Sequence, residues 1–355
     1  MAFTKPTFVA AGDSGNDWDY DAWPKVNLLF DAANAGALQG FKNRLINGGF
    51  RLNQRAAASN ADDTYCLDRW YVLTQTGTIA ASQLTDPETG AVNGIRLTQS
   101  QAVAQRMGLA QIIESANCRD LRSVITTLAG RVRLSTSDNI RYAVLEWTGT
   151  ADAVTSDVVS NWTSTSYTAG GFFNSTTLNV LAVGQVAAVA ATWRDLTALN
   201  ATLGASANNI IVMVWTENAV AQNVTLDLNS MQFEAGATAT HFDHLPISVV
   251  TALCQRYFQL GGGGASGRSQ STTSVVVGAP FPAVMRAAPT RAIVNTGFSV
   301  RVNGASSSAA TGAAIVNSGA TVDGWYIQTN GFTGLTVADT VHVISANPFS
   351  FDAEL

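Results

Sequence analysis

Two separated stretches of the chain decide its fold: Asn43-Arg-Leu-Ile-Asn-Gly-Gly-Phe-Arg-Leu-Asn-Gln-Arg55 and Met231-Gln-Phe-Glu-Ala-Gly-Ala-Thr-Ala-Thr-His-Phe-Asp-His244. The first alternates apolar and polar residues around a Gly-Gly break, which is the period of a half-buried strand. The second is a strand-like segment followed by a glycine turn and a short polar segment that ends on an aromatic residue. Because the sequence between them is also strand-like, we predict a β-sandwich whose first and last strands lie together.

The sequence between these two stretches contains short apolar runs bounded by Gly, Asn, Asp or Ser. The clearest runs are residues 69–73, 94–97, 130–134, 142–147, 210–215 and 224–228. Regular spacing of short strands and turn residues is typical of a β-sandwich. We therefore predict about eight strands in a jelly roll. Residues 105–115 and 193–199 fit either a strand or a short helix.

The one helix expected between the β-rich regions follows the sandwich. Pro246 is suited to its start because proline lacks the N–H that a first helical turn leaves unpaired. The apolar residues Val249, Val250, Leu253, Cys254 and Tyr257 recur at helical spacing. Gly261 to Gly264 are predicted to end the helix and to form a flexible joint. The apolar stripe suits packing on the sandwich and a three-helix bundle with copies of the chain equally well.

The pattern predicts an all-β protein with four parts: an N-terminal arm at 1–42, a jelly-roll sandwich at 43–245, a helix and glycine-rich joint at 246–268, and a second β domain at 269–355. The second β domain carries its own strand-like runs at residues 273–277, 298–302, 324–328, 339–344 and 350–355. The arm is acidic and aromatic at 12–24 and fits a short helix at 26–38. So small a segment cannot bury a core alone, so it must dock on another surface, on its own domain or elsewhere.

The composition favours an assembled structural protein over a nucleic-acid or membrane protein. Only 13% of the 355 residues are charged, and 46% are hydrophobic. So few charges favour burial of surface in an oligomer, although a monomer with a surface of Ser, Thr and Asn is the alternative. The net charge of −5 argues against binding to nucleic acid, which needs clustered cations. The most apolar run, at 179–193, is too short to span a membrane. The three cysteines are expected to be buried thiols.

The sequence contains no recognisable catalytic or cofactor motif. No Gly-x-Ser-x-Gly nucleophile elbow and no phosphate-binding glycine loop occurs. The acidic residues Asp17, Asp19 and Asp21 lack the glycine and the glutamate of a calcium loop. His241 and His244 have a spacing that suits a metal site on a helix better than one at a strand end. We therefore expect no enzyme activity, no cofactor and no metal.

Sugar binding needs only an exposed aromatic ring flanked by groups that hydrogen-bond to hydroxyls. The candidate residues are Trp162 and Tyr167 in one polar loop, and Trp325 and Tyr326 with Asp323 and Gln328 near one strand. Side chains alternate across a strand, so one ring of the pair 325 and 326 is expected to face inward and the other outward. The alternative for each aromatic residue is a role in packing alone.

Five segments in order resemble the receptor-binding fibre and spike proteins of tailed phages, including their prophage and gene-transfer-agent relatives, with a jelly roll like that of carbohydrate-binding modules. The segments are LINGGFRLNQR (45–55), YCLDRWYV (65–72), MQFEAGATATHFDH (231–244), LCQRYFQL (253–260) and MRAAPT (285–290). The resemblance is best over residues 43–260.

The resemblance implies a homotrimeric virion protein. Its arm, with Trp18, Tyr20 and Trp23, would attach to a head or tail protein of the particle, and its C-terminal β domain would face the receptor. Its function would be non-catalytic attachment to host-surface polysaccharide. A purely structural head-decoration or fibre-base protein is the first alternative, and a spike that depolymerises glycans is the second.

Overall fold

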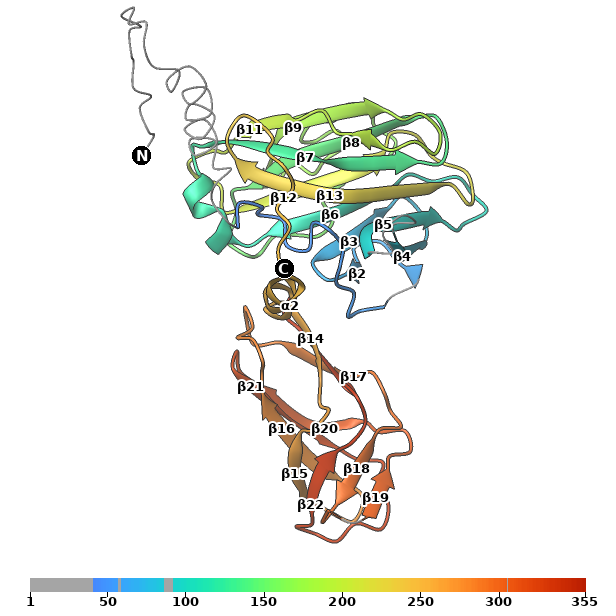
Figure 1. Cartoon of the computed structure of the whole chain (residues 1–355), viewed down its shortest axis with the longest axis vertical. Helices are drawn as coiled ribbons and strands as arrows, with labels where there is room; N and C mark the ends of the chain where they lie inside the picture. Colours follow the sequence, from blue (N-terminus) through green and yellow to red (C-terminus); the bar gives the residue numbers. More distant parts are fainter. Residues whose placement is uncertain (1–40, 57–58, 86–91, 305) are drawn as a thin grey trace, which may run out of the picture.

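The computed structural model describes residues 41–56, 59–85, 92–304 and 306–355. It contains two β-rich units that lie one beyond the other along the long axis, with helix α2 (Ile247–Gln255) at their junction (Figure 1). Every pair of named strands is antiparallel, and the predicted all-β fold is confirmed.

The first unit is built from two sheets. Sheet A has the order β1-β4-β5-β13-β7-β10, with β11 also paired to β7. Its strands are β1 (Ser59–Asn60), β4 (Ile79–Thr85), β5 (Val92–Gln99), β7 (Ile125–Leu134), β10 (Arg194–Asp195), β11 (Leu199–Thr202) and β13 (Thr225–Ala235).

Sheet B has the order β2-β3-β6-β12-β8-β9. Its strands are β2 (Tyr65–Leu67), β3 (Trp70–Thr74), β6 (Met107–Ile113), β8 (Asn139–Trp147), β9 (Leu178–Ala187) and β12 (Asn209–Thr216). Two short 3-10 turns, η1 (Ser115–Asn117) and η2 (Arg119–Leu121), follow β6.

Strand β12 lies at the centre of the layers and is buried on both faces. Its side chains Ile210, Val212 and Val214 pack in the core between sheets A and B. The alternate side chains, among them Met213 and Trp215, face away from sheet A and are also fully buried. A strand that is buried on both faces carries a continuous run of apolar residues rather than an alternation of apolar and polar ones. This burial explains the sequence NIIVMVWT.

The segment between β8 and β9, residues 148–177, covers the outer face of sheet B. Phe172 stacks on Trp215 with ring centroids 5.1 Å apart, and Phe173 meets the same indole edge-on at 5.6 Å. The face of sheet B that looks away from sheet A is therefore closed by the chain itself. The cysteines of the chain, Cys66, Cys118 and Cys254, are free and buried, as predicted.

The two stretches quoted first do lie side by side, but residues 43–55 are not a strand. They form turns held against β13 by backbone hydrogen bonds, from the Arg44 N–H to the Phe233 carbonyl (2.8 Å) and from the Met231 N–H to the Gly48 carbonyl (2.9 Å). A Cβ atom at Gly48 would lie 2.1 Å from the Met231 carbonyl oxygen, so only glycine permits this approach. The Gly-Gly break therefore allows the turn to approach β13 closely and is not part of a strand.

The two ambiguous segments are both resolved as strands. Residues 107–113 form β6 in the middle of sheet B, and the region 193–202 supplies the short strands β10 and β11 at the edge of sheet A. The sandwich therefore has more strands than the eight or so predicted, because several pairing segments are only two to four residues long.

The helix is shorter than predicted. It starts after Pro246 as expected but ends at Gln255 rather than at the glycines. Residues 258–261 form strand β14 instead, because they pair with β23 (Phe349–Asp352). Within the chain, Val250 and Cys254 are the buried residues of the helix. No described helix has both the length and the apolar character needed to cross a membrane.

The second unit also has two sheets. Sheet C has the order β14-β23-β17, and sheet D has the order β19-β18-β22-β15-β16-β21-β20. The strands are β14 (Phe258–Gly261), β15 (Ser266–Ser269), β16 (Val275–Pro280), β17 (Thr290–Ile293), β18 (Ser299–Val302), β19 (Ser306–Ala309), β20 (Ile315–Ala320), β21 (Gly324–Thr329), β22 (Thr340–Val343) and β23 (Phe349–Asp352). Their shared core includes Trp325 of sheet D, whose ring lies 5.4 Å from Phe349 and 4.9 Å from Phe351 of sheet C.

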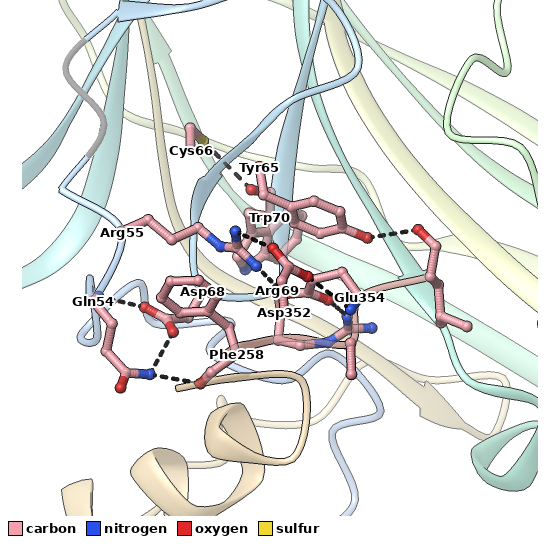
Figure 2. A network of polar contacts seen from close by, with 12 residues as sticks. Gln54, Arg55, Tyr65, Cys66, Asp68, Arg69, Trp70, Phe258, Asp352 and Glu354 are labelled. Carbon is pink, nitrogen blue, oxygen red and sulfur yellow. Dashed lines mark hydrogen bonds and ion pairs between the residues drawn. The ribbon is translucent and has the colours of Figure 1, made fainter. Parts of the chain in front are cut away.

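The end of β23 is fastened to the first unit by a buried network of ion pairs (Figure 2). Arg55 contacts Asp352 at 2.8 Å and Glu354 at 3.1 Å, and Arg69 forms an ion pair with Glu354. The Arg69 side chain is only 1% exposed and that of Glu354 only 5%. The guanidinium of Arg55 also lies over the ring of Phe258 at 3.9 Å.

A second set of contacts at the same junction surrounds the residues after α2. The Arg256 guanidinium and the Tyr257 hydroxyl both contact the Glu114 carboxylate of the first unit at 2.7 Å. The ring of Tyr257 lies under the Arg69 guanidinium at 3.6 Å. We call these contacts and the network of Figure 2 together the joint. Its buried charges are paired, which is the condition for keeping them out of water.

Candidate functional site

The outer face of sheet D is a sheet surface that the fold leaves open. Sheet C covers the inner face, so alternation along each strand sends one set of side chains into the core and the other outward. In β21, Trp325 is 7% exposed and Tyr326 is 45% exposed. The same alternation holds in β22, where Val341 and Val343 are buried and His342 between them is exposed.

The register of sheet D arranges the outward side chains in two adjacent rows across the strands. One row contains Ser307, Arg301, His342, Ser266, Gly278, Tyr326 and Gly319. The other contains Thr340, Arg268, Val276, Gln328 and Asn317. With strands about 4.8 Å apart, the four strand steps from Tyr326 to Arg301 span roughly 19 Å. We call these two rows the sheet D face.

Tyr326 has a glycine as its cross-strand neighbour on both sides. Gly278 is its partner in β16 and Gly319 its partner in β20. A Cβ atom at Gly319 would lie 2.4 Å from the Cε1 atom of the Tyr326 ring, so the ring occupies the space that a side chain at 319 would fill. The absence of neighbouring side chains leaves an aromatic ring supported by backbone and open to solvent.

Hydrogen-bonding groups flank this ring on the sheet D face. The exposed His342 holds its Nδ1 atom 2.9 Å from the Ser266 hydroxyl. Gln328 is half-buried beside Tyr326, and Asn317 is its exposed cross-strand neighbour. An exposed ring next to amide groups can stack on the apolar face of a sugar and bond to its hydroxyls. Ser266 and His342, roughly 10 and 14 Å from Tyr326 along the same row, can bond to a neighbouring sugar unit.

The structure separates the four residues predicted near β21. Tyr326 and Gln328 lie on the sheet D face, whereas Trp325 is a core residue between sheets C and D. Asp323 lies in the exposed turn before β21, where its carbonyl accepts the Phe281 N–H at 2.8 Å. Of this group, only Tyr326 and Gln328 share an open surface.

The other predicted pair, Trp162 and Tyr167, belongs to the segment that covers sheet B. Both half-buried rings meet Phe172 edge-on, at 5.5 Å and 5.4 Å. The Arg141 guanidinium lies over the Tyr167 ring at 4.6 Å. Burial, followed by the charge of the nearby Glu217 carboxylate, raises the pKa of the Tyr167 hydroxyl. These contacts make both residues part of the packing on the outer face of sheet B.

The remaining sequence predictions about sites have these outcomes. Trp18, Tyr20 and Trp23 lie outside the described residues. His241, Asp243 and His244 lie in the segment after β13, where the ring of His244 packs edge-on against Phe242 at 4.9 Å. Within the described ranges, no group of three or more His, Cys, Asp or Glu side chains is placed to hold a metal ion.

The two stretches quoted first, together with α2, line a groove of about 230 Å³. Phe41, Phe242, Leu245 and Val250 make much of its wall, and the Phe242 ring lies against Gly49. Phe41 adjoins residues 1–40, which lie outside the described residues, and the groove is assigned no function.

Sequence inspection missed Arg268, Arg301 and His342 as members of a site. A signal was present, because Arg301 and His342 each interrupt an alternating run of valines, in Val300-Arg-Val302 and Val341-His-Val343. Alternation shows that such residues face outward, but it does not show that their strands are neighbours.

No family model matches this chain, and no curated protein matches its sequence. Similar solved structures exist. A candidate sugar-binding protein from Bacteroides thetaiotaomicron is 11% identical, with a TM-score of 0.34, over 55% of this chain and 100% of that one. The C-terminal family 22 carbohydrate-binding module of Clostridium thermocellum Xyn10B is 9% identical, with a TM-score of 0.30, over 51% of this chain and 94% of the module.

A third similar structure is the enzymatically active domain of tailspike protein 4 from bacteriophage CBA120. It is 9% identical, with a TM-score of 0.31, over 55% of this chain and 22% of that one. At these identities and TM-scores, the three similarities carry no information about what this chain binds.

Proposed function

We propose that this chain attaches a phage or phage-like particle to host-surface polysaccharide by non-catalytic binding through the sheet D face. The observation that carries the binding part is Tyr326, an exposed ring seated on Gly319 and bordered by Gln328 and Asn317, with the His342–Ser266 pair further along the same row. Such a surface offers weak contacts to each sugar unit. Several copies of the chain on one particle would add these contacts together through avidity.

The binding part is tested with the intact protein on an array of bacterial capsular and O-antigen polysaccharides, followed by calorimetry with the bound glycan. Tyr326→Ala removes the stacking ring and should weaken binding about tenfold, equivalent to ~1.4 kcal/mol. Tyr326→Phe keeps the ring and should retain most of the affinity. Val337→Ala, at a side chain that is 61% exposed outside the sheet D face, is the matched control.

Equal binding by wild type and Tyr326→Ala would remove the sheet D face from the proposal. Wild-type protein that binds no polysaccharide would favour the purely structural role, in a head decoration or fibre base. New reducing ends in the incubated polysaccharide would contradict the non-catalytic part and favour a depolymerising spike.

The particle part of the proposal rests on the resemblance of the five sequence segments to phage fibre and spike proteins. It includes a homotrimer, an arm at 1–42 that binds a head or tail protein, and a receptor-facing domain at 269–355. Mass spectrometry of purified particles should detect the chain, and light scattering of the isolated protein should give three times its 37.2 kDa mass. A monomer that is absent from particles would contradict this part.

A further inference from the structure

The sheet D face carries arginines whose charges are not neutralised by the protein. In the described part of the chain, four arginines have a guanidinium with neither a side-chain nor a backbone partner: Arg119, Arg194, Arg268 and Arg301. Two of these four, Arg268 and Arg301, are exposed together on the sheet D face.

The outer face of sheet A shows the opposite arrangement. There Arg96 and Arg133 both contact the buried Asp227, at 2.8 Å and 2.7 Å, and Arg131 contacts Asp195 at 3.0 Å. Sheet A therefore pairs these three arginines and leaves only Arg194, in its edge strand β10, without a partner, whereas sheet D leaves both of its arginines available for a ligand.

Carboxylates are absent from the rows of the sheet D face. Between residues 262 and 348 the chain has four arginines and two aspartates, although its overall net charge is −5. The two aspartates, Asp323 and Asp339, lie in turns just before β21 and β22. Asp339 is already engaged, by the Asn303 amide at 2.8 Å and the Thr336 N–H at 2.9 Å. The face is thus locally positive on an acidic protein.

Tyr326 and the two arginines are too far apart for one small anion to contact all three. Arg268 lies opposite Thr340, and Arg301 lies opposite His342 on the other side of the same strand. Two strand spacings across and two residues along the strand separate their Cα atoms by about 12 Å. Arg268 is separated from Tyr326 by a similar distance of about 12 Å. A ligand that reaches all three must therefore be an extended chain, and negative charges repeated along it would match the two unpaired guanidinium groups.

We infer that the ligand of the sheet D face is an anionic polysaccharide whose charges are carboxylates, as in polymers of uronic acids. This inference rests on the proposed function. A guanidinium matches a carboxylate with two parallel hydrogen bonds, while Tyr326 stacks on a sugar ring of the same chain. Carboxylates are favoured over phosphates because the described helices all lie outside sheet D, so no helix N-terminus adds the N–H donors that commonly surround a phosphate.

The test compares acidic bacterial polysaccharides with their carboxyl-reduced forms, which keep the sugar backbone but lose the charge. Wild-type protein should bind the native polymers but not their carboxyl-reduced forms. Its affinity for the native polymers should fall as the salt concentration increases. Arg268→Gln and Arg301→Gln should each weaken binding about fivefold, the effect expected of one exposed ion pair. Arg119→Gln, at an exposed arginine in the first unit, should have no effect. Because Arg268 and Arg301 have no protein partner, the melting temperatures should not change.

Each other outcome overturns the inference in a distinct way. Equal binding to carboxyl-reduced polymers, still dependent on Tyr326, would remove the charge requirement and leave the proposed function intact. Binding to sulfated polymers alone would overturn the choice of carboxylates. Equal binding to carboxylated glycans, sulfated glycans and DNA, weakened by Arg119→Gln as well, would indicate non-specific electrostatics. Failure to bind any polysaccharide, native or reduced, would contradict both the inference and the proposed function.

Discussion

At the scale of single residues, Asp63 is an exception to the rule that buried polar atoms have partners. Its Oδ1 atom is buried without a hydrogen bond, and its backbone has a φ of 59°, which Asn and Asp tolerate better than most residues. Burial, followed by the charges of Asp62 and Asp157, raises the pKa of Asp63 to about 7. This carboxyl group is therefore held in its neutral form well above its usual range.

Asp63→Asn should stabilise the protein in a pH-dependent way. A carboxyl group with a raised pKa in the folded state stabilises the fold below its unfolded pKa, near 3.9, and that contribution is lost as the pH rises through about 7. Asparagine cannot ionise and avoids this loss. The melting temperature of the variant should exceed that of wild type above about pH 7 and match it near pH 4. An equal increase in melting temperature at both pH values would show that the stabilisation does not come from the ionisation of Asp63. The same pH dependence for the exposed control Asp323→Asn would show this too.

At the scale of elements, sheet D depends on glycines that lie under an aromatic ring. Gly319→Ala places a methyl group 2.4 Å from the Tyr326 ring and should force the ring off its backbone support. We expect weaker polysaccharide binding in calorimetry with little loss of thermal stability, because the ring is on the exposed face. Gly297→Ala, where the nearest atom would be 3.7 Å away, is the matched control. Unchanged binding by Gly319→Ala would show that the ring position is unimportant.

The sequence predicts where the strands of this fold lie better than it predicts which strands pair with one another. Alternation places Tyr326 and Trp325 on opposite faces, and the structure agrees, because this pattern depends only on local geometry. The position of β15 between β22 and β16 depends on long-range pairing that no local pattern encodes. The same limit explains the helix end, since residues 258–261 become a strand only because β23 lies beside them.

The covering segment at 148–177 illustrates a second limit of sequence inspection. Its polar loop around Trp162 resembles an exposed binding loop in composition. The apolar residues that anchor it, Phe172 and Phe173, meet their partner Trp215 only in the folded sheet B. Composition therefore indicates where a loop occurs, but tertiary packing decides which of its aromatic residues are available to a ligand.

At the scale of the whole molecule, the joint fixes one β unit against the other. Glu354→Ala would leave the Arg69 guanidinium, which is 1% exposed, without its carboxylate partner. Breaking a buried pair in this way typically costs about 3–5 kcal/mol. Chemical denaturation should show a loss of this order, and small-angle scattering should show a larger radius of gyration as the units separate.

The control for this prediction is Asp120→Asn at the exposed pair Arg44–Asp120, where the aspartate side chain is 59% exposed. Surface pairs of this kind contribute about 0–1 kcal/mol. Equal destabilisation by the two substitutions, or an unchanged radius of gyration for Glu354→Ala, would mean that the ion pairs do not hold the units together.

The joint also has a mechanical consequence. The polypeptide backbone passes between the two units once, through the segment that contains α2 (Figure 1). On that connection alone, a surface held by sheet D could swivel freely about the first unit. The ion pairs at the end of β23, the central strand of sheet C, add a second stretch of chain that contacts the first unit, beside Phe258 just after that crossing. Buried contacts from two segments of the chain oppose this swivelling, so tension applied at sheet D reaches the first unit through a stiff junction rather than a flexible tether.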